Sequence, residues 1–397
     1  MNRLKYLIAT LGGFQFGYTV GIMSGAILFL TTQFNLSPDQ QGGLVSAFLF
    51  GSLPGSIIAG PLVNWLGRKK LQQAAALVFL LGTLMLVYAS SVTEIFTGRV
   101  IEGLAVGIFA VVGPMYLAEI SPAEKRGFYI GCYQLAVTLG IFVAYGINYL
   151  FSASGDWKWM FGLGMIPAIF QFIGFFSLPE STPPAHVEKH KFSWSTFLEP
   201  QMRYALIVVI LINVFQQITG INAILYFAPT IFQSAGFASP QTAILATNAM
   251  GIINFVMTIV SMFLVDKWGR RPLLITGIIG VIIGLAGLST AFLLEGSAAK
   301  GLATASMLTF TAAFAIGLGP LPQLLAPEMF KRSVRGIGIS IGGLSNWISN
   351  ILVVYTFMDL TSRISHAGTF AVYGFLGLIA LFFVWKYVPE TKGKAID

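Results

Sequence analysis

The sequence predicts an all-helical membrane protein with twelve transmembrane helices in two six-helix halves. Three observations support this fold class: the composition, the spacing of the charges, and an internal repeat. Of the 397 residues, 56% are hydrophobic and only 10% are charged. A water-soluble protein of this size cannot cover its surface with so few charges. The composition therefore argues against a soluble enzyme, a nucleic-acid-binding protein and a disordered regulator.

The spans are predicted from stretches that lack Asp, Glu, Lys and Arg, because a membrane-spanning helix needs roughly 20 apolar residues. In chain order these stretches are 6–38, 40–67, 71–93, 127–155, 159–179, 204–265, 272–294, 301–327, 336–358 and 364–385. The stretch 204–265 is 62 residues long and contains a turn-like segment at 234–240, so it predicts two helices. Segment 95–118 carries only Arg99 and Glu102 and supplies the twelfth span. No barrel-type alternation is present, which leaves helices as the spanning structure.

The loop charges predict the orientation in the membrane. Of the 23 Lys and Arg residues, 19 fall at the two termini and in the loops on the same side as the termini. The opposite loops carry Lys158, Lys300 and Arg363, and Arg99 lies within a span. By the positive-inside rule both termini are cytoplasmic. The net charge of +8 therefore reflects topology and requires no nucleic acid or other anionic partner.

The predicted organisation has no extramembrane domain. We expect an N-terminal bundle at 1–180, a short cytoplasmic linker at 181–202, a C-terminal bundle at 203–388 and a short tail at 389–397. The linker favours an amphipathic crossover over a catalytic insert because it is short. A single cysteine, Cys132, excludes an internal disulfide and a cysteine metal cluster. The compact loops favour a bacterial inner membrane over a eukaryotic plasma membrane.

Three pairs of local motifs repeat between the halves in the same order. Residues 64–69 match 266–271 at an offset of 202, and the later pairs match at offsets of 209 and 210. Parallel repeats of this kind are typical of transporters that rock about a central site. We interpret the charged residues of the repeat as a cytoplasmic gate whose bonds form when the halves close on that side; simple topology anchors are the alternative. The gate residues are Arg68, Glu119, Arg126, Glu180, Asp266, Arg270, Glu328, Arg335 and Glu390.

Several motifs resemble signatures of the sugar porter family of the major facilitator superfamily. They are Phe16-Gly-Tyr18, Gly98-Arg99, 114–122, 216–222, 266–271, 317–322 and 389–393. The resemblance extends over essentially the whole chain and is most specific in 216–222 and 389–393. It implies the major facilitator fold and transport of a sugar by alternating access.

Amide side chains within the spans point to the same kind of solute. A buried amide is costly unless it faces a cavity or a partner, and amides both donate and accept hydrogen bonds, as a neutral polyol requires. The resemblance implies that the sugar site is lined by Gln134, Gln216, Gln217, Asn222, Asn254, Asn346 and Trp347, with Tyr226 in an outer gate. Interhelical bonding is the alternative for any single amide, and it is our interpretation of Asn248. Residues 219–220 and 317–322 are expected to weaken their helices as gating segments.

Thr19, Arg99 and Glu102 bear on whether transport is passive or coupled to protons. Relatives that co-transport protons carry Asp where this chain has Thr19, which cannot exchange a proton near neutral pH. The resemblance therefore favours facilitated diffusion by a uniporter. Against this, Glu102 is a carboxylate within a span and a candidate proton carrier. A structural pair with Arg99, three residues earlier on the same helix face, is the simpler interpretation. Asn64 replaces an acidic residue of the family motif, so we expect a weaker gate in the N-terminal half.

Two other functional classes fit the sequence less well than a transporter. A transporter-like sugar sensor is disfavoured because the tail ends about ten residues after the last span, whereas such receptors carry long tails. A membrane enzyme is disfavoured because His186, His190 and His366 form no catalytic or metal set with a third ligand. We expect no cofactor, no metal, and a monomer whose partners are a small neutral sugar and the lipid bilayer. Asn35 lies in a glycosylation sequon that matters only in a eukaryotic host.

Overall fold

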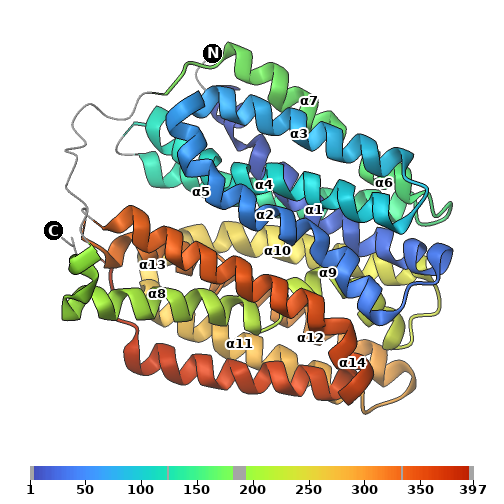
Figure 1. Cartoon of the computed structure of the whole chain (residues 1–397). Coiled ribbons are helices and arrows are strands. Elements are labelled where there is room, and N and C mark those ends of the chain that lie inside the picture. The colour runs from blue at the N-terminus through green and yellow to red at the C-terminus, as the bar shows by residue number, and fades with distance from the viewer. Residues whose placement is uncertain (1–3, 123–124, 182–193, 332–333, 393–397) are drawn as a thin grey trace. The chain divides into compact units, whose positions relative to one another are not determined.

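The computed structural model describes residues 4–122, 125–181, 194–331 and 334–392, and these residues are helical almost throughout (Figure 1). The α-helices are α1 (Leu4–Phe34), α2 (Pro38–Leu66), α3 (Arg68–Tyr88), α4 (Val92–Ile120), α5 (Arg126–Leu150), α6 (Trp157–Gly162), α7 (Met165–Gly174), α8 (Pro200–Ile218), α9 (Ile221–Ser234), α10 (Pro240–Trp268), α11 (Arg270–Ala291), α12 (Gly296–Ile316), α13 (Leu321–Met329) and α14 (Arg335–Tyr387). Two short 3-10 helices, η2 (Phe175–Ser177) and η3 (Trp194–Leu198), complete the order.

The predicted spans correspond to helices, and local capping explains where some of them begin. Ser37 caps α2, and its hydroxyl accepts a hydrogen bond from the Gln40 backbone N–H. Ser91 caps α4 in the same way through Glu94. Both are capping boxes that satisfy the free N–H groups of a helix start. Ser37 therefore has a structural role in addition to its place in the Asn35 sequon.

Several spans contain breaks. The two segments expected to weaken their helices do so: α8 gives way to α9 at Gly220, which is left-handed at φ 89°, and α12 ends before 317–320. The predicted separation of 336–358 from 364–385 is confirmed, because α14 consists of two helices that meet at a kink. The kink lies at Ser365, whose φ of 68° and ψ of 165° are not helical.

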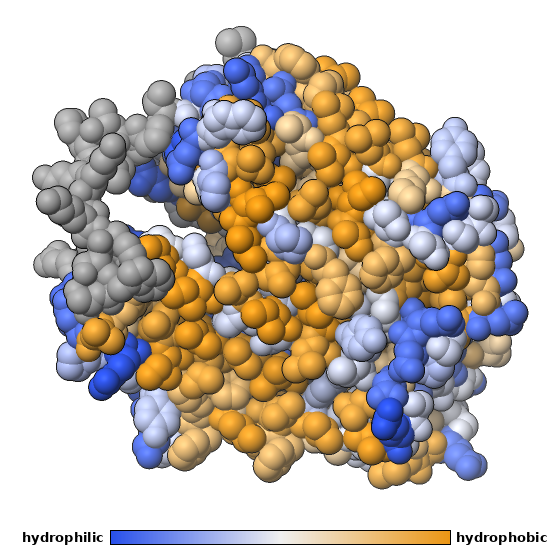
Figure 2. Space-filling model, viewed as in Figure 1, coloured by the Kyte–Doolittle hydropathy of each residue, from blue (hydrophilic) through white to orange (hydrophobic). Residues whose placement is uncertain are grey.

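The outer surface of the helices is apolar, as the composition requires. Within the described residues, eleven helical segments are long and apolar enough to cross a membrane. Large hydrophobic side chains such as Leu81, Phe170 and Phe375 are each more than 60% exposed, and hydrophobic residues cover much of the face in Figure 2. Exposed apolar surface on this scale is stable only against lipid. The protein is therefore a multi-pass membrane protein.

The contacts divide the chain into two compact units. The first unit contains the described residues up to 181 together with Leu225–Thr230 and Ala238–Gly251. Within it, α2 packs against α4 and α1 packs against α5. A Cβ atom on Gly17 would lie 1.8 Å from the Val137 carbonyl oxygen, and one on Gly51 would lie 2.0 Å from that of Val100. Glycine at these crossings lets the backbones approach closely, which is how helices associate in a membrane.

Two polar contacts join the parts of α9 and α10 that belong to the first unit to α5. The Tyr145 hydroxyl donates to the Leu225 carbonyl at 3.0 Å. The Asn248 amide donates to the Tyr145 carbonyl at 3.1 Å. The interpretation of Asn248 as an interhelical amide is therefore confirmed.

The second unit contains most of the remaining helices. It comprises the described residues 194–224, 231–237 and 252–392. Here α11 packs against α12 and α14, and α8 packs against α13 and α14. The Ser261 hydroxyl of α10 donates to the Ile316 carbonyl at the end of α12, at 2.9 Å. This packing places the end of α8 beside the break between α12 and α13, which positions the candidate site.

Candidate functional site

Four of the predicted site residues form one hydrogen-bonded cluster in the second unit. Asn222 Nδ2 donates to Gln217 Oε1 at 2.7 Å, and Gln217 Nε2 donates to Asn346 Oδ1 at 3.0 Å. Asn346 Nδ2 in turn donates to Gln216 Oε1 at 2.5 Å. The cluster joins α8, α9 and α14. We call these four residues, Gln216, Gln217, Asn222 and Asn346, the amide cluster.

Gln216 also holds a segment outside the cluster. Its Nε2 donates to the Leu318 carbonyl at 2.6 Å and to the Gly319 carbonyl at 3.0 Å. Both carbonyls lie in the break between α12 and α13. The Gln216 amide therefore connects the amide cluster to this break.

A fifth amide, Asn213, belongs to the same network and was missed in the sequence. Asn346 Nδ2 lies 3.3 Å from Asn213 Oδ1 and 3.4 Å from the Asn213 carbonyl oxygen. Asn213 is 7% exposed. The signal was available, because Asn213 precedes Gln216 and Gln217 by three and four residues and so shares their helix face.

The other predicted site residues are not part of this network. Asn254 lies on α10 and is 7% exposed. Trp347 follows Asn346 on α14 and is half-buried. Gln134 and Tyr226 belong to the first unit, where Gln134 is half-buried and Tyr226 is fully buried. The buried Tyr226 hydroxyl has no hydrogen-bond partner within the described part of the chain.

The predicted pair of Arg99 and Glu102 is formed and is completely buried. Arg99 Nη1 lies 3.1 Å from Glu102 Oε2, and the side chains are 0% and 3% exposed. The Thr83 hydroxyl donates to the other Glu102 oxygen at 2.8 Å. The guanidinium also donates to the Thr19 carbonyl at 3.3 Å and lies 5.1 Å from the Phe48 ring. Glu102 is therefore held in place by two donors, as expected for a structural ion pair.

The N-terminal cluster consists of Arg68, Glu119, Glu180 and Ser181. Arg68 binds Glu119 through Nη2 at 2.9 Å and Nε at 3.2 Å, and Ser181 Oγ donates to the second Glu119 oxygen at 2.5 Å. Glu180 accepts the Arg68 backbone N–H at 2.8 Å, at the start of α3. A carboxylate at this position satisfies free N–H groups and favours the helix dipole.

The C-terminal cluster repeats this arrangement with Arg270, Glu328, Glu390 and Thr391. Arg270 binds Glu328 at 2.8 Å, and Thr391 Oγ1 donates to the second Glu328 oxygen at 2.5 Å. Glu390 accepts the Arg270 and Arg271 backbone N–H groups, each at 3.0 Å. The repeat read from the sequence therefore corresponds to two similar sets of bonds.

The structure explains why each repeated Gly-Arg motif requires a glycine. Gly67 and Gly269 precede α3 and α11 with φ values of 80° and 90°. A Cβ atom on Gly67 would lie 2.9 Å from a Glu180 oxygen, and one on Gly269 would lie 2.6 Å from a Glu390 oxygen. Both the backbone conformation and the carboxylate that caps the helix therefore require glycine.

These contacts modify the interpretation of the charged residues as a gate between the halves. The bonds given above for the described residues each lie within one unit, and they stabilise the end of that unit's helix bundle. Arg126 and Arg335 donate to backbone carbonyls of their own units, those of Ala118 and Phe330. This follows from the sequence order, because Glu180 and Glu390 each follow the last span of the half whose helix they cap.

The replacement of an acidic residue by Asn64 has a small structural consequence. In the C-terminal half, the corresponding Asp266 lies 3.6 Å from Arg270, and its side chain is 80% exposed. An ion pair this exposed contributes little to stability. Asn64 is also exposed. The expected weakening of the N-terminal cluster is therefore limited to one solvent-screened pair.

Comparison with known proteins identifies the family. The model of the "Sugar (and other) transporter" family matches residues 5–185 and 183–397. The chain belongs to this sugar transporter family. It is 33% identical to the galactose-proton symporter of Escherichia coli K12, over all of this chain and 93% of the relative. It is 32% identical to the glucose transporter GlcP of Staphylococcus epidermidis, over all of this chain and 97% of the relative.

A solved structure of the D-xylose-proton symporter is similar throughout. It has a TM-score of 0.85 and 31% identity, and the match covers 99% of both chains. The resemblance to the sugar porter family in the sequence is therefore confirmed. Because the family consists of transporters, the transporter interpretation replaces the enzyme alternative.

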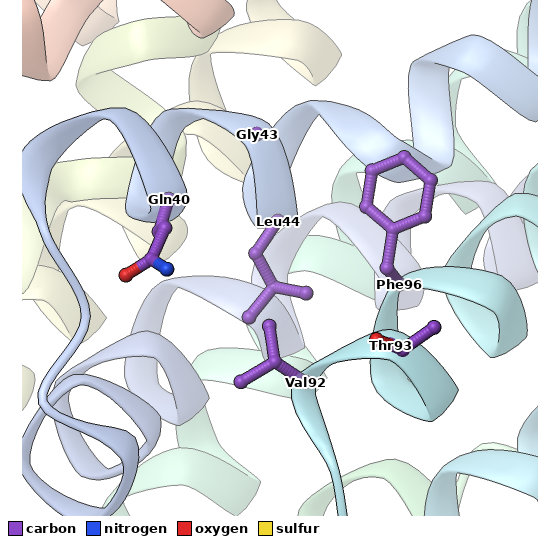
Figure 3. A pocket seen from close by; sticks show the side chains of 6 residues that line it. All are labelled: Gln40, Gly43, Leu44, Val92, Thr93 and Phe96. Carbon is purple, nitrogen blue, oxygen red and sulfur yellow. The ribbon is translucent and has the colours of Figure 1, made fainter.

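Two remaining features contain none of the four residues of the amide cluster. A pocket between the starts of α2 and α4 is lined by Gln40, Gly43, Leu44, Val92, Thr93 and Phe96 (Figure 3). It contains none of the predicted site residues. His366 is half-buried on α14, with its ring 4.7 Å from that of Phe292. His186 and His190 lie outside the described residues.

The C-terminal cluster of the transporter predicts a loss of stability in acid. Burial alone would raise the pKa of Glu390, but hydrogen bonds from the backbone N–H groups of Lys392, Arg270 and Arg271 outweigh it and lower the pKa below the ordinary 4.5. A lowered pKa stabilises the fold above the ordinary value, and this contribution is lost as the pH falls through the lowered one. We therefore expect the melting temperature of the purified protein to fall below about pH 4.5.

The matched variant for this pH dependence is Glu390→Gln, which keeps a hydrogen-bond acceptor and removes the titrating group. Its melting temperature should be lower than that of the parent near neutral pH, and the difference should shrink on acidification. A constant difference between the two proteins at all pH values would contradict the assignment.

Proposed function

We propose that this transporter carries a neutral monosaccharide, a hexose or a pentose, across the membrane by alternating access. The observation that carries the proposal is the amide cluster, in which uncharged donors and acceptors from three helices converge. A sugar hydroxyl both donates and accepts, so it can replace amide–amide bonds one for one. The sugar specificities named in the relatives support this solute class.

We further propose the topology given by the loop charges. The two helices of α14 meet at Ser365, and each is long enough to cross the roughly 30 Å hydrocarbon core, so α14 supplies two spans. This gives twelve spans in two halves, at 1–180 and 203–388, with both termini cytoplasmic. The bacterial sources of the two relatives named above support a bacterial inner membrane.

The sugar site in this proposal contains the amide cluster, Asn254 and Trp347 from the second unit and Gln134 from the first. Tyr226 forms part of the outer gate. Asn254 supports the assignment because a buried amide within a span needs polar partners, and a sugar hydroxyl can be one of them. Trp347 offers an aromatic surface for the apolar face of a sugar ring.

The proposed energetic mode is uniport. Thr19 offers no group that exchanges a proton near neutral pH, and Glu102 is bound by both Arg99 and Thr83. Proton symport through Glu102 is the second candidate. It is favoured by the burial of this carboxylate within a span and by the proton-symporter names of two relatives.

Uptake into proteoliposomes separates these modes. We expect saturable uptake of a hexose or pentose whose rate and final level are unchanged by an imposed pH gradient, because no proton moves with the sugar. Accumulation above equilibrium that is abolished by a protonophore would instead establish symport. The absence of saturable flux for every sugar in a hexose and pentose panel would contradict the transport proposal itself.

A further inference from the structure

The break between α12 and α13 leaves a backbone carbonyl without its usual helical partner. In a helix, the Leu318 carbonyl would accept from the N–H four residues later. That residue is Pro322, which has no N–H. A buried carbonyl without a donor is costly, so this segment needs a donor from elsewhere.

Gln216 supplies that donor from α8. Its Nε2 donates to the Leu318 oxygen at 2.6 Å and to the Gly319 oxygen at 3.0 Å. Gln216 is 7% exposed, and Leu318 is completely buried. The bond is therefore shielded from competing water.

The other end of the same side chain belongs to the amide cluster. Gln216 Oε1 accepts from Asn346 Nδ2 at 2.5 Å and lies 3.5 Å from Gln217 Nε2. Both amide protons and the oxygen of Gln216 are thus engaged by protein groups. A sugar hydroxyl that replaces Asn346 or Gln217 as donor would bind the oxygen of the Gln216 amide. The nitrogen of the same planar amide binds the carbonyls of the break.

We propose that Gln216 is a positioning residue that couples occupancy of the amide cluster to the α12–α13 break. Sugar hydroxyls exchange with the donors on its oxygen and shift its amide relative to the Leu318 and Gly319 carbonyls. The bonds that hold the break therefore become weaker or stronger when a sugar binds. This inference rests on the proposed function for the identity of the solute, whereas the link to the break is independent of it.

The test uses a single cysteine on α13 as a reporter. Gln323 is exposed on this helix, so Gln323→Cys in a Cys132→Ser background gives one labelling site in the full-length protein. The rate of maleimide labelling is measured in detergent without sugar and with saturating D-xylose, D-glucose or D-galactose. The comparison is between Gln216→Met, which keeps the length of the side chain and loses its donors, and Gln217→Met, the matched change one residue later.

We expect Gln216→Met to raise the sugar-free labelling rate several-fold and to remove its dependence on sugar. Gln217→Met should leave the sugar-free rate unchanged and should retain the response to sugar, at higher sugar concentrations. Equal sugar-free rates in the parent and Gln216→Met would overturn the proposal. So would equal behaviour of the two variants.

A second variant keeps the test decisive if Gln216→Met folds poorly. Pro322→Ala restores a backbone N–H four residues after Leu318, so it should return the labelling rate of Gln216→Met towards that of the parent. Gln216→Asn keeps the amide and shortens its reach, and it should behave like Gln216→Met. If Pro322→Ala slows labelling in neither the Gln216→Met nor the Gln216→Asn protein, Gln216 is not the donor that the Leu318 carbonyl requires.

The outcomes also separate this inference from the proposed function. If no sugar alters labelling in the parent and none is transported, the solute assignment fails. The sugar-free comparison then still decides whether Gln216 holds the break. If sugars are transported and the sugar-free rates do not differ, only the coupling role fails.

Discussion

Replacing Glu102 with glutamine is expected to destabilise the transporter by about 3–5 kcal/mol, because it leaves the buried Arg99 charge uncompensated. Arg99 is completely buried, and the ion pair with Glu102 at 3.1 Å neutralises its charge. The change keeps the size and the acceptor of the side chain, so packing is not the cause. Thermal unfolding of the purified protein measures the loss.

The control for this prediction is Thr83→Val. Thr83 donates to Glu102 at 2.8 Å but carries no charge, so removing its hydroxyl costs only about 1–3 kcal/mol. A Glu102→Gln protein that is as stable as the parent, or no less stable than Thr83→Val, would show that the charge of Glu102 is not what the fold requires.

Charge balance also predicts a rescue from a neighbouring helix. Arg99 donates to the Thr19 carbonyl at 3.3 Å, so residue 19 lies beside the guanidinium. The buried Thr19 hydroxyl has no hydrogen-bond partner among the described residues. A carboxylate introduced as Thr19→Asp in the Glu102→Gln background should therefore recover at least half of the lost stability. No recovery would mean that a specific Glu102 contact, and not its charge, is essential.

The spans could be predicted closely from the sequence because the membrane imposes a simple rule on charge. Charges are costly within the hydrocarbon, so the gaps between them mark the helices. The breaks at Gly220 and 317–320 were also predictable, since glycine and proline act locally. The two helices of α14 were predictable as well, because Asp359 and Arg363 separate their apolar stretches, but the position of the kink at Ser365 was not.

The partners of the site residues could not be predicted in the same way. The sequence shows that Gln216, Gln217 and Asn346 are polar in apolar stretches, but it does not show which helices lie side by side. The amides consequently bind one another, and Gln216 also binds the Leu318 carbonyl. Asn213 belongs to the network because α8 packs against α14, which the sequence does not show. The Arg99–Glu102 pair was predictable because its spacing lies within one helix.

Gln217→Ala is expected to weaken sugar binding about 5- to 150-fold, which corresponds to a free energy of about 1–3 kcal/mol. Gln217 has the central position in the amide cluster, where it accepts from Asn222 at 2.7 Å and donates to Asn346 at 3.0 Å. In the proposed site a sugar exchanges amide–amide bonds for amide–hydroxyl bonds. Without Gln217, a sugar hydroxyl and the amides of Asn222 and Asn346 each lose one hydrogen-bond partner.

The measurement is the dissociation constant from calorimetric titration or from sugar-dependent thermal stabilisation. The matched control is Gln41→Ala, which removes a buried amide that binds the nearby Leu36 carbonyl at 3.2 Å in the other half. This change should lower stability without altering the dissociation constant. Asn222→Ala should weaken binding in the same direction as Gln217→Ala, because it removes a donor from the same oxygen. Unchanged affinity in both cluster variants, with transport intact, would place the sugar at a different set of residues.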